Sequence, residues 1–212
     1  MTRANSDVRT ALLRSVGRIH GAVVSQRRIL RLADHVAALM PHGASVLDIG
    51  CGDGKLASQI REQRPDLRIC GIDVLIRPPV PLPVAQFDGF RVPVRDRGVD
   101  VALMVDVLHH TEDPLILLKE ASRVARQAVV IKDHVADRRA AHILLRIMDW
   151  VGNAPHGVAL PYNYLSRRQW TEAFREAGLH PQVWRGRLDL YPRPFSLLLD
   201  RDMHFVACLR AA

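Results

Sequence analysis

Residues 45–57 read Ser45-Val-Leu-Asp-Ile-Gly-Cys-Gly-Asp-Gly-Lys-Leu-Ala57, and this stretch decides the fold. An apolar run contains an acid near its end, three glycines follow at alternate positions, and a helix-like pattern begins directly afterwards. In open parallel sheets, ligands bind beyond the carboxyl ends of the strands, where a strand gives way to a helix. The stretch therefore predicts a ligand-binding turn at residues 50–54.

Two common phosphate-binding motifs fit this turn poorly. A P-loop needs Gly-Lys followed by Ser or Thr, but Lys55 is followed by Leu56. A dinucleotide fingerprint fits Gly50 and Gly52 but puts Lys55 where a third glycine lets helix and strand pack closely. The pattern that fits is an acid at Asp48 followed by alternate glycines, because no Cβ then blocks a non-phosphate ligand from lying along the backbone.

The composition is that of a basic chain with enough apolar residues for one core. The chain has 212 residues, 48% of them hydrophobic, and a formal net charge of +8, which suits one large domain better than two. The charge raises the alternative of a nucleic-acid partner, but the arginines are spread along the chain and no basic run is interleaved with aromatic residues. A genome-wide bias toward arginine codons explains the charge more simply, and nucleic acid is not expected as a partner.

The cysteines and the hydropathy pattern indicate a cytoplasmic protein. Cys51, Cys70 and Cys208 are odd in number, widely spaced and embedded in apolar segments, which favours neither a disulfide framework nor a zinc cluster. No metal site is predicted. No apolar run approaches the roughly 18 to 20 residues that a membrane span requires, so none is expected. The N-terminal region is rich in arginine and poor in acids, as transit peptides are, but we interpret its arginines as the outer face of helices.

The chain is predicted to form a single domain, residues 1–212, in four consecutive parts. Residues 1–43 carry apolar groups at helical spacing and predict N-terminal helices. Residues 44–132 alternate strand-like and helix-like runs, which indicates a parallel sheet covered on both faces. Residues 133–165 form an irregular insert, and residues 166–212 predict a helix and two strands. The expected strands are residues 45–49, 68–72, 84–87, 99–105, 128–132, 182–187 and 204–209.

The glycine turn resembles motif I of the class I S-adenosylmethionine-dependent methyltransferases in its residues VLDIGCGDG, 46–54. Asp73, in GID, matches the acid that holds both ribose hydroxyls in that family. Asp88-Gly89, in QFDGF, matches the loop that meets the adenine amine. Residues 87–114, FDGFRVPVRDRGVDVALMVDVLHHTEDP, resemble the fourth-strand block of a small-molecule ("type 11"-like) subgroup that includes ubiquinone-pathway and sterol methylases.

This resemblance implies a fold, a cofactor and an activity. The fold is the Rossmann-like α/β fold of the class I methyltransferases, with a seven-stranded, mostly parallel sheet, helices on both faces and an antiparallel last strand. The cofactor is S-adenosylmethionine, and the activity is methyl transfer to a small molecule. The cofactor-binding residues that the resemblance implies are Asp48, Gly50, Cys51, Gly52, Asp73, Val74, Asp88, Gly89, Asp106, Val107 and His109.

Methyl transfer from a sulfonium is a direct displacement, so the protein contributes by aligning the acceptor and excluding water. A base is needed only where the acceptor must lose a proton near neutral pH, which favours histidine or a perturbed carboxylate. Histidines 109 and 110 follow the fourth predicted strand, and Asp133 and His134 follow the fifth. The predicted catalytic residues are Asp133, His134 and His110, with cofactor packing, helix capping or a loop anchor as the structural alternatives.

We expect the insert to cover the methyl-donor end of the cleft and to select the substrate. Its helix, about residues 137–150, would turn Ile143, Ile147 and Met148 toward the pocket. The expected acceptor is a small, apolar or partly aromatic molecule. The predicted substrate-binding residues are Trp150, Asn153, His156, Tyr162 and Tyr164. The alternative account makes the insert a structural or dimer-forming arm, so a homodimer stays open.

Two other functions stay open from the sequence alone. An RNA methyltransferase would use the basic surface beside the cofactor cleft, and a binding module would keep the cofactor pocket without turnover. Methylases of amino groups in nucleic acids and glutamine typically carry Asn/Asp-Pro-Pro-Tyr after the fourth strand, whereas this chain has Asp106-Val-Leu-His109. That difference weighs against base N-methylation.

Overall fold

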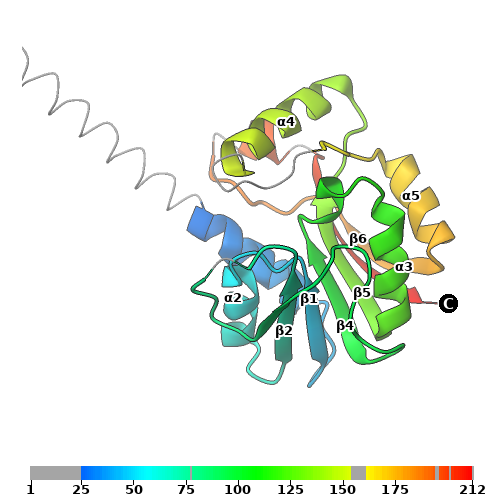
Figure 1. The fold of residues 1–212 in the computed structure, drawn as a ribbon. Helices are drawn as coiled ribbons and strands as arrows, with labels where there is room; N and C mark the ends of the chain where they lie inside the picture. Colours follow the sequence, from blue (N-terminus) through cyan, green and yellow to red (C-terminus); the bar gives the residue numbers. More distant parts are fainter. Residues whose placement is uncertain (1–24, 77, 154–160, 194–195, 201, 212) are drawn as a thin grey trace, which may run out of the picture.

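The computed structural model describes residues 25–76, 78–153, 161–193, 196–200 and 202–211. These residues form a central sheet with helices packed on its two faces and one further helix across its upper edge (Figure 1). The helices predicted within residues 1–24 lie outside the described residues.

The sheet has seven strands in the order β3-β2-β1-β4-β5-β7-β6. All neighbouring strands pair in parallel except β7, which runs antiparallel to both β5 and β6. This topology confirms the predicted Rossmann-like fold with an antiparallel last strand. The strands are β1 (Ser45–Ile49), β2 (Arg68–Asp73), β3 (Val84–Gln86), β4 (Val99–Val105), β5 (Ala125–His134), β6 (Leu179–Arg185) and β7 (His204–Ala211).

Helices cover both faces of the sheet. Figure 1 shows α3 (Pro114–Val124) and α5 (Arg167–Glu176) on one side and α2 (Lys55–Gln63) with helical residues 25–37 on the other. The remaining helices are the single 3-10 turn η1 (Leu108–His110), α4 (Arg139–Asn153) and the short α6 (Ser196–Leu199). Within the described part of the chain, no helix is both long and apolar enough to cross a membrane.

The central strands carry apolar residues on both faces, which explains why helices cover both faces of the sheet. Leu47, Met104 and Ile131 belong to a core that includes Leu117 of α3 and Trp170 of α5. Their chain neighbours point to the other face, where Val46, Leu103 and Val130 meet side chains of α2 and of residues 25–37. A strand that is buried on both faces needs a nearly continuous apolar run, and the glycine turn follows such a run.

The structure corrects several predicted boundaries. Strand β5 continues two residues beyond its predicted end, because Asp133 and His134 pair with Phe205 and His204 of β7. The part of the chain taken as irregular therefore begins within the sheet and includes the whole of α4. Strand β6 begins at Leu179 rather than residue 182, and it tolerates Pro181 because it is an edge strand. Neither η1 nor α6 was predicted.

The predicted start of α5 is confirmed in detail. The Ser166 side chain accepts a hydrogen bond from the backbone N–H of Gln169, and the Gln169 side chain accepts one from the backbone N–H of Ser166. This capping box satisfies two backbone donors that the helix itself leaves without partners.

Replacing Ser166 with alanine should lower the free energy of unfolding by about 1 kcal/mol, because the N-cap acceptor is lost. Urea denaturation followed by far-UV circular dichroism measures this loss. Ser166→Asp keeps an acceptor at the same position and serves as the matched control, which should lose much less. Equal losses in the two variants would contradict a capping role.

Candidate functional site

The glycine turn between β1 and α2 holds a backbone shape that side chains would prevent. Gly50, Gly52 and Gly54 have φ values of 75°, 60° and 69°, in the left-handed region that glycine adopts without strain. A Cβ on Gly50 would lie 2.5 Å from Cγ2 of Val107, and one on Gly54 would lie 2.2 Å from Cδ2 of Leu82. The predicted ligand-binding turn is therefore built around close approaches, and Val107 packs directly over it.

Asp73 ends β2 beside this turn. Its Oδ2 accepts a hydrogen bond from the backbone N–H of Gly52 at 2.7 Å, and its Oδ1 accepts one from Leu75 at 2.9 Å. An ionised carboxylate offers about four acceptor positions, so others remain for a ligand. The carboxylate is thus fixed against the turn and can accept further hydrogen bonds, as a ribose diol would require.

Exposed apolar side chains flank Asp73. Val74 is 52% exposed and Phe90 is 64% exposed. The loop that carries Phe90 is shaped by Asp88, whose Oδ1 accepts the backbone N–H groups of Phe90 and Arg91. Gly89 brings this loop against Val74, since a Cβ there would lie 3.0 Å from Cγ1 of Val74. The two apolar groups beside a fixed carboxylate fit a planar heterocycle joined to a sugar.

Asp48 lies beneath the turn and is 3% exposed. Burial, together with the neighbouring Asp73 carboxylate, raises the pKa of Asp48 to about 7. Cys51 lies beside the same strands, and its Sγ would be 2.5 Å from a Cβ on Gly71 of β2. Cys51 therefore packs the turn closely against β2.

Beyond the turn, the carboxyl ends of β4 and β5 carry a group of charges. Lys132 and Arg28 each donate a hydrogen bond to the carboxylate of Asp106, one to each oxygen. Although burial opposes ionisation, these cations hold the pKa of Asp106 well below its ordinary value. Asp106 has a φ of 56°, unusual for a residue with a side chain. The sequence predicted Asp106 here but neither of its partners.

Asp133 is an anchor in this arrangement. Its Oδ1 accepts the Nδ1–H of His109 at 2.6 Å and the backbone N–H of His134 at 2.7 Å, and its Oδ2 accepts the backbone N–H of Leu108 at 3.0 Å. Burial opposes its ionisation, but His109 keeps the pKa of Asp133 far below the ordinary range. These contacts favour the anchor alternative over the role of proton acceptor that the sequence suggested for Asp133.

His109 lies between two carboxylates. Its Nδ1 meets Asp133, and its Nε2 lies 3.3 Å from Oδ2 of Asp149 on α4. Burial alone would lower its pKa, but the two carboxylates raise the pKa of His109 to about 10. His109 is therefore an imidazolium at neutral pH. His110 follows it in η1, with ring centroids 4.1 Å apart.

His134 has the opposite character. Burial and the nearby Lys132 and His109 lower the pKa of His134 to about 4, so the ring is neutral at pH 7. Its Nδ1 lies 3.4 Å from Oδ1 of Asp133, 3.8 Å from Oδ1 of Asp106 and 3.4 Å from Nδ1 of His109. The neutral imidazole carries a proton on one ring nitrogen and a lone pair on the other.

Helix α4 closes over this cluster through its inner face. Asp149 accepts the Tyr164 hydroxyl at 2.5 Å, and Tyr162 lies next to Tyr164 with ring centroids 6.4 Å apart. The expectation that Ile143 and Ile147 face the pocket is wrong, because they are 62% and 55% exposed.

The other predicted substrate residues are placed differently. Trp150 is 62% exposed on the outer side of α4, and Met148 packs against a cluster that includes Leu32 and Tyr191. Asn153 ends α4, but its side chain lies outside the description, and His156 lies outside the described residues.

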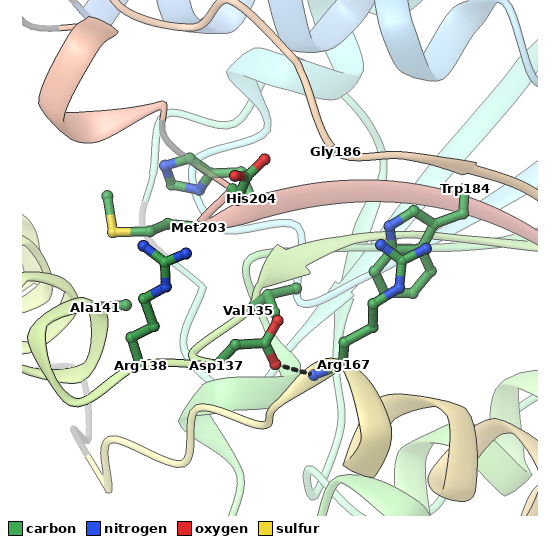
Figure 2. Close-up of a pocket in the computed structure, with 10 residues that line it drawn as sticks. Val135, Asp137, Arg138, Ala141, Arg167, Trp184, Gly186, Met203 and His204 are labelled. Carbon is green, nitrogen blue, oxygen red and sulfur yellow. Dashed lines mark hydrogen bonds between the residues drawn. The ribbon is translucent and has the colours of Figure 1, made fainter.

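A cavity of about 620 Å³ lies at the carboxyl ends of β5 and β6 and the start of β7. Figure 2 shows Arg138 and Arg167 reaching into it from below, with Trp184 on one side and Met203 and His204 on the other. The Arg167 guanidinium lies 4.9 Å from the centre of the Trp184 ring. These residues were not predicted, because they come from four segments that the pairing of β7 with both β5 and β6 brings together.

The raised pKa of Asp48 predicts a pH-dependent stability. The folded state favours the protonated acid, so its stability falls as the pH rises from about 4 to about 7. Asp48→Asn should remove this penalty and raise the free energy of unfolding by up to about 4 kcal/mol at pH 8, with little gain at pH 4. Urea denaturation at the two pH values measures the difference in unfolding free energy between Asp48→Asn and the wild type, and Asp96→Asn, at an exposed carboxylate, is the control. A difference that is the same at both pH values would contradict the raised pKa of Asp48.

Comparison with known proteins agrees with this geometry. Residues 24–182 match the family model Methyltransf_23, described as a methyltransferase domain. A structure of the Haloferax volcanii Trm112 methyltransferase activator in complex with a methyltransferase is similar, with 20% identity, a TM-score of 0.64, and coverage of 92% of this chain and 94% of that chain. An S-adenosylmethionine-dependent methyltransferase from Mesorhizobium loti is 17% identical, with a TM-score of 0.62 and coverage of 84% and 96%.

A third similar structure carries ligands. It is the geranyl diphosphate C-methyltransferase from Streptomyces coelicolor in complex with Mg²⁺, geranyl diphosphate and S-adenosyl-L-homocysteine, at 12% identity, a TM-score of 0.64, and coverage of 85% of this chain and 78% of that chain. At these identities the structures show a shared fold. The family match spans most of the chain, so the chain belongs to the methyltransferase-domain family and is a class I methyltransferase with S-adenosylmethionine as its cofactor.

Proposed function

We propose that this methyltransferase acts on a small, apolar or partly aromatic molecule and that His134 accepts the proton that the acceptor releases. The observation that carries the proposal is the position of the His134 imidazole at the sheet edge, where Asp133 and Trp170 hold the residue in place. Along that edge the glycine turn follows β1, Asp106 follows β4, His134 ends β5, and its pairing partner His204 starts β7. His134 therefore stands between the cofactor turn and the cavity.

The residues around the turn suit S-adenosylmethionine, which supplies a methyl carbon bonded to a positively charged sulfur. Asp73 would accept the ribose hydroxyls, since its carboxylate is fixed by Gly52 and keeps acceptor positions. Val74 and Phe90 would flank the adenine, which accounts for their exposure. Asp88 and Gly89 would meet the adenine edge, as the family resemblance implies.

The cluster beneath α4 suits a proton acceptor. Asp133 holds the backbone N–H of His134 and faces its Nδ1, which orients the ring as a carboxylate orients histidine in other general bases. Trp170 adds a second restraint, because its Nε1–H donates to the backbone oxygen of His134 at 2.8 Å. The imidazole is 5% exposed, so its lone pair is kept from bulk water.

The cavity gives the acceptor a place next to this base. Its wall residue His204 has its ring centroid 4.9 Å from that of His134. A volume of about 620 Å³ suits a small molecule. The Trp184 ring is held between the Arg167 guanidinium and the Phe205 ring, so it forms a fixed wall. Met203 connects the cavity to the cluster that contains Tyr164.

The alternatives are less well supported. An RNA methyltransferase needs a continuous positive surface beside the cleft, but the cavity walls carry Asp137 and Asp202 as well as Arg138 and Arg167. A binding module without turnover would have no need of a neutral, oriented imidazole at His134. Both alternatives are separated from methyl transfer to a small molecule by the experiments below.

His134→Ala should reduce turnover at least about 100-fold, because general bases contribute about 10² to 10⁴ in rate. Protein incubated with methyl-labelled S-adenosylmethionine and an organic-solvent extract of cells should label a compound in that extract, with purified RNA assayed in parallel. His180→Ala, at an exposed histidine of β6, should leave turnover unchanged. Label in RNA alone would support the RNA alternative, and an unchanged rate in His134→Ala would remove His134 as the base.

Asp73→Ala should weaken S-adenosylmethionine binding by about 1 to 3 kcal/mol, the loss of two hydrogen bonds to an ionised acceptor. Calorimetric titration measures the affinity, and thermal unfolding of the same sample checks that the turn is intact. Asp96→Ala removes an exposed carboxylate far along the chain and is the control. An affinity equal to that of the wild type would mean that the ribose is held elsewhere.

A further inference from the structure

Helix α4 exposes a stripe of large apolar side chains on its outer side. Ile143, Ile147 and Trp150 are 62%, 55% and 62% exposed, and their spacing of four and three residues puts them on one side of the helix. Figure 1 shows α4 lying across the top of the molecule, with no other described element beyond it. We call these three side chains, with the flanking Arg139 and Arg146, the α4 outer face.

The core does not account for this exposure, because the opposite side of α4 already packs inward. Leu145 is 1% exposed and joins a buried cluster with Ala136, Tyr164 and Met203. Asp149 is held by Tyr164 and lies against His109. A surface helix normally turns polar side chains outward, so a second apolar side indicates an apolar partner.

The charges on α4 indicate which partner. Arg139 and Arg146 are exposed, and Arg138 directly precedes the helix. Asp149 is the one acid between residues 139 and 153, and it is buried against His109. The described part of the outer face therefore carries cations and no exposed acid. Isoleucine, tryptophan and arginine together are the composition of helices that lie in a membrane interface.

A second copy of the chain suits this face less well. A two-fold contact through α4 would place Arg139 and Arg146 of both copies on one shared surface whose described residues include no exposed acid to pair with them, and like charges repel. Three side chains also provide little of the roughly 800 Å² per partner that a stable protein interface buries. A bilayer accepts the same face, because the apolar groups enter the acyl boundary while guanidinium groups stay at the level of the phosphates.

We propose that the α4 outer face docks on the surface of a lipid bilayer that contains anionic lipids. The cavity would then lie close to the lipid, since Ala141 of α4 and the preceding Arg138 line it. The nature of the acceptor rests on the proposed function. If the chain methylates a small molecule, that acceptor is a membrane-resident amphiphile with a head group that can be methylated.

Vesicle co-sedimentation of the full chain, without cofactor, tests the docking. Binding is expected to vesicles of phosphatidylcholine mixed with phosphatidylglycerol, with much less to phosphatidylcholine alone, and it should weaken as salt is added. Ile147→Ser should reduce the binding constant by about tenfold, because one large apolar side chain is no longer buried. Ile116→Ser, at an exposed isoleucine of α3, is the matched control and should bind as the wild type does.

Two further measurements assign the contact to α4. Tryptophan fluorescence should shift to the blue on vesicle binding, and Trp150→Phe should remove the shift. Arg139→Gln with Arg146→Gln should weaken binding more than Arg168→Gln with Arg175→Gln, an equal charge change on α5.

Three results would overturn the proposal. They are no binding to anionic vesicles, equal binding by Ile147→Ser and wild type, and light scattering that shows a dimer which Ile147→Ser dissociates. None of these measurements uses S-adenosylmethionine or turnover. Failure of the docking therefore leaves methyl transfer untouched, and failure of methyl transfer leaves the docking result standing.

Discussion

A group of opposite charges, mostly buried where β4 and β5 end, holds the upper half of this molecule together. Lys132, Arg28 and His109 face the carboxylates of Asp106, Asp133 and Asp149. Three positive and three negative groups balance, as burial demands, because an unpaired buried charge costs several kcal/mol. In each ion pair the two partners come from different parts of the chain. The helical residues 25–37 are tied to β4 through Arg28, and α4 is tied to η1 through Asp149.

The fold was predictable because its signals are local. Glycines at positive φ, apolar runs buried on both faces and a capping box all appear within a few residues of each other, so the turn, the strands and the start of α5 were found in the sequence. The end of β5 was not, because its last two residues are strand only through pairing with β7, some 70 residues later. The outward turn of Ile143 was also missed, since a helical stripe does not say which of two sides faces the core.

The site was predictable in position but only partly in chemistry. The sequence placed Asp106, His109, Asp133 and His134 at one rim, because carboxyl ends of parallel strands share an edge. Their roles depend on contacts across long stretches of chain, such as Arg28 with Asp106 and His109 with Asp149. Neighbouring Asp133 and His134 also differ in their contacts, because the Asp133 carboxylate accepts hydrogen bonds from His109, from the backbone of Leu108 and from the backbone of His134.

Within this network two neighbouring histidines have opposite pKa shifts. Their ring centroids are 4.5 Å apart, yet the pKa of His109 is raised to about 10 and that of His134 is lowered to about 4. His109 stays charged because Asp133 faces its Nδ1 and Asp149 faces its Nε2. That positive charge, together with Lys132 and burial, keeps His134 neutral. Asp149 on α4 is one of those carboxylates. If α4 lifted away, His109 would lose a counter-charge and hold its proton less tightly, and a neutral His109 would oppose a proton on His134 less. The position of α4 therefore contributes, through Asp149, to the raised pKa of His109 and, through the charge of His109, to the lowered pKa of His134.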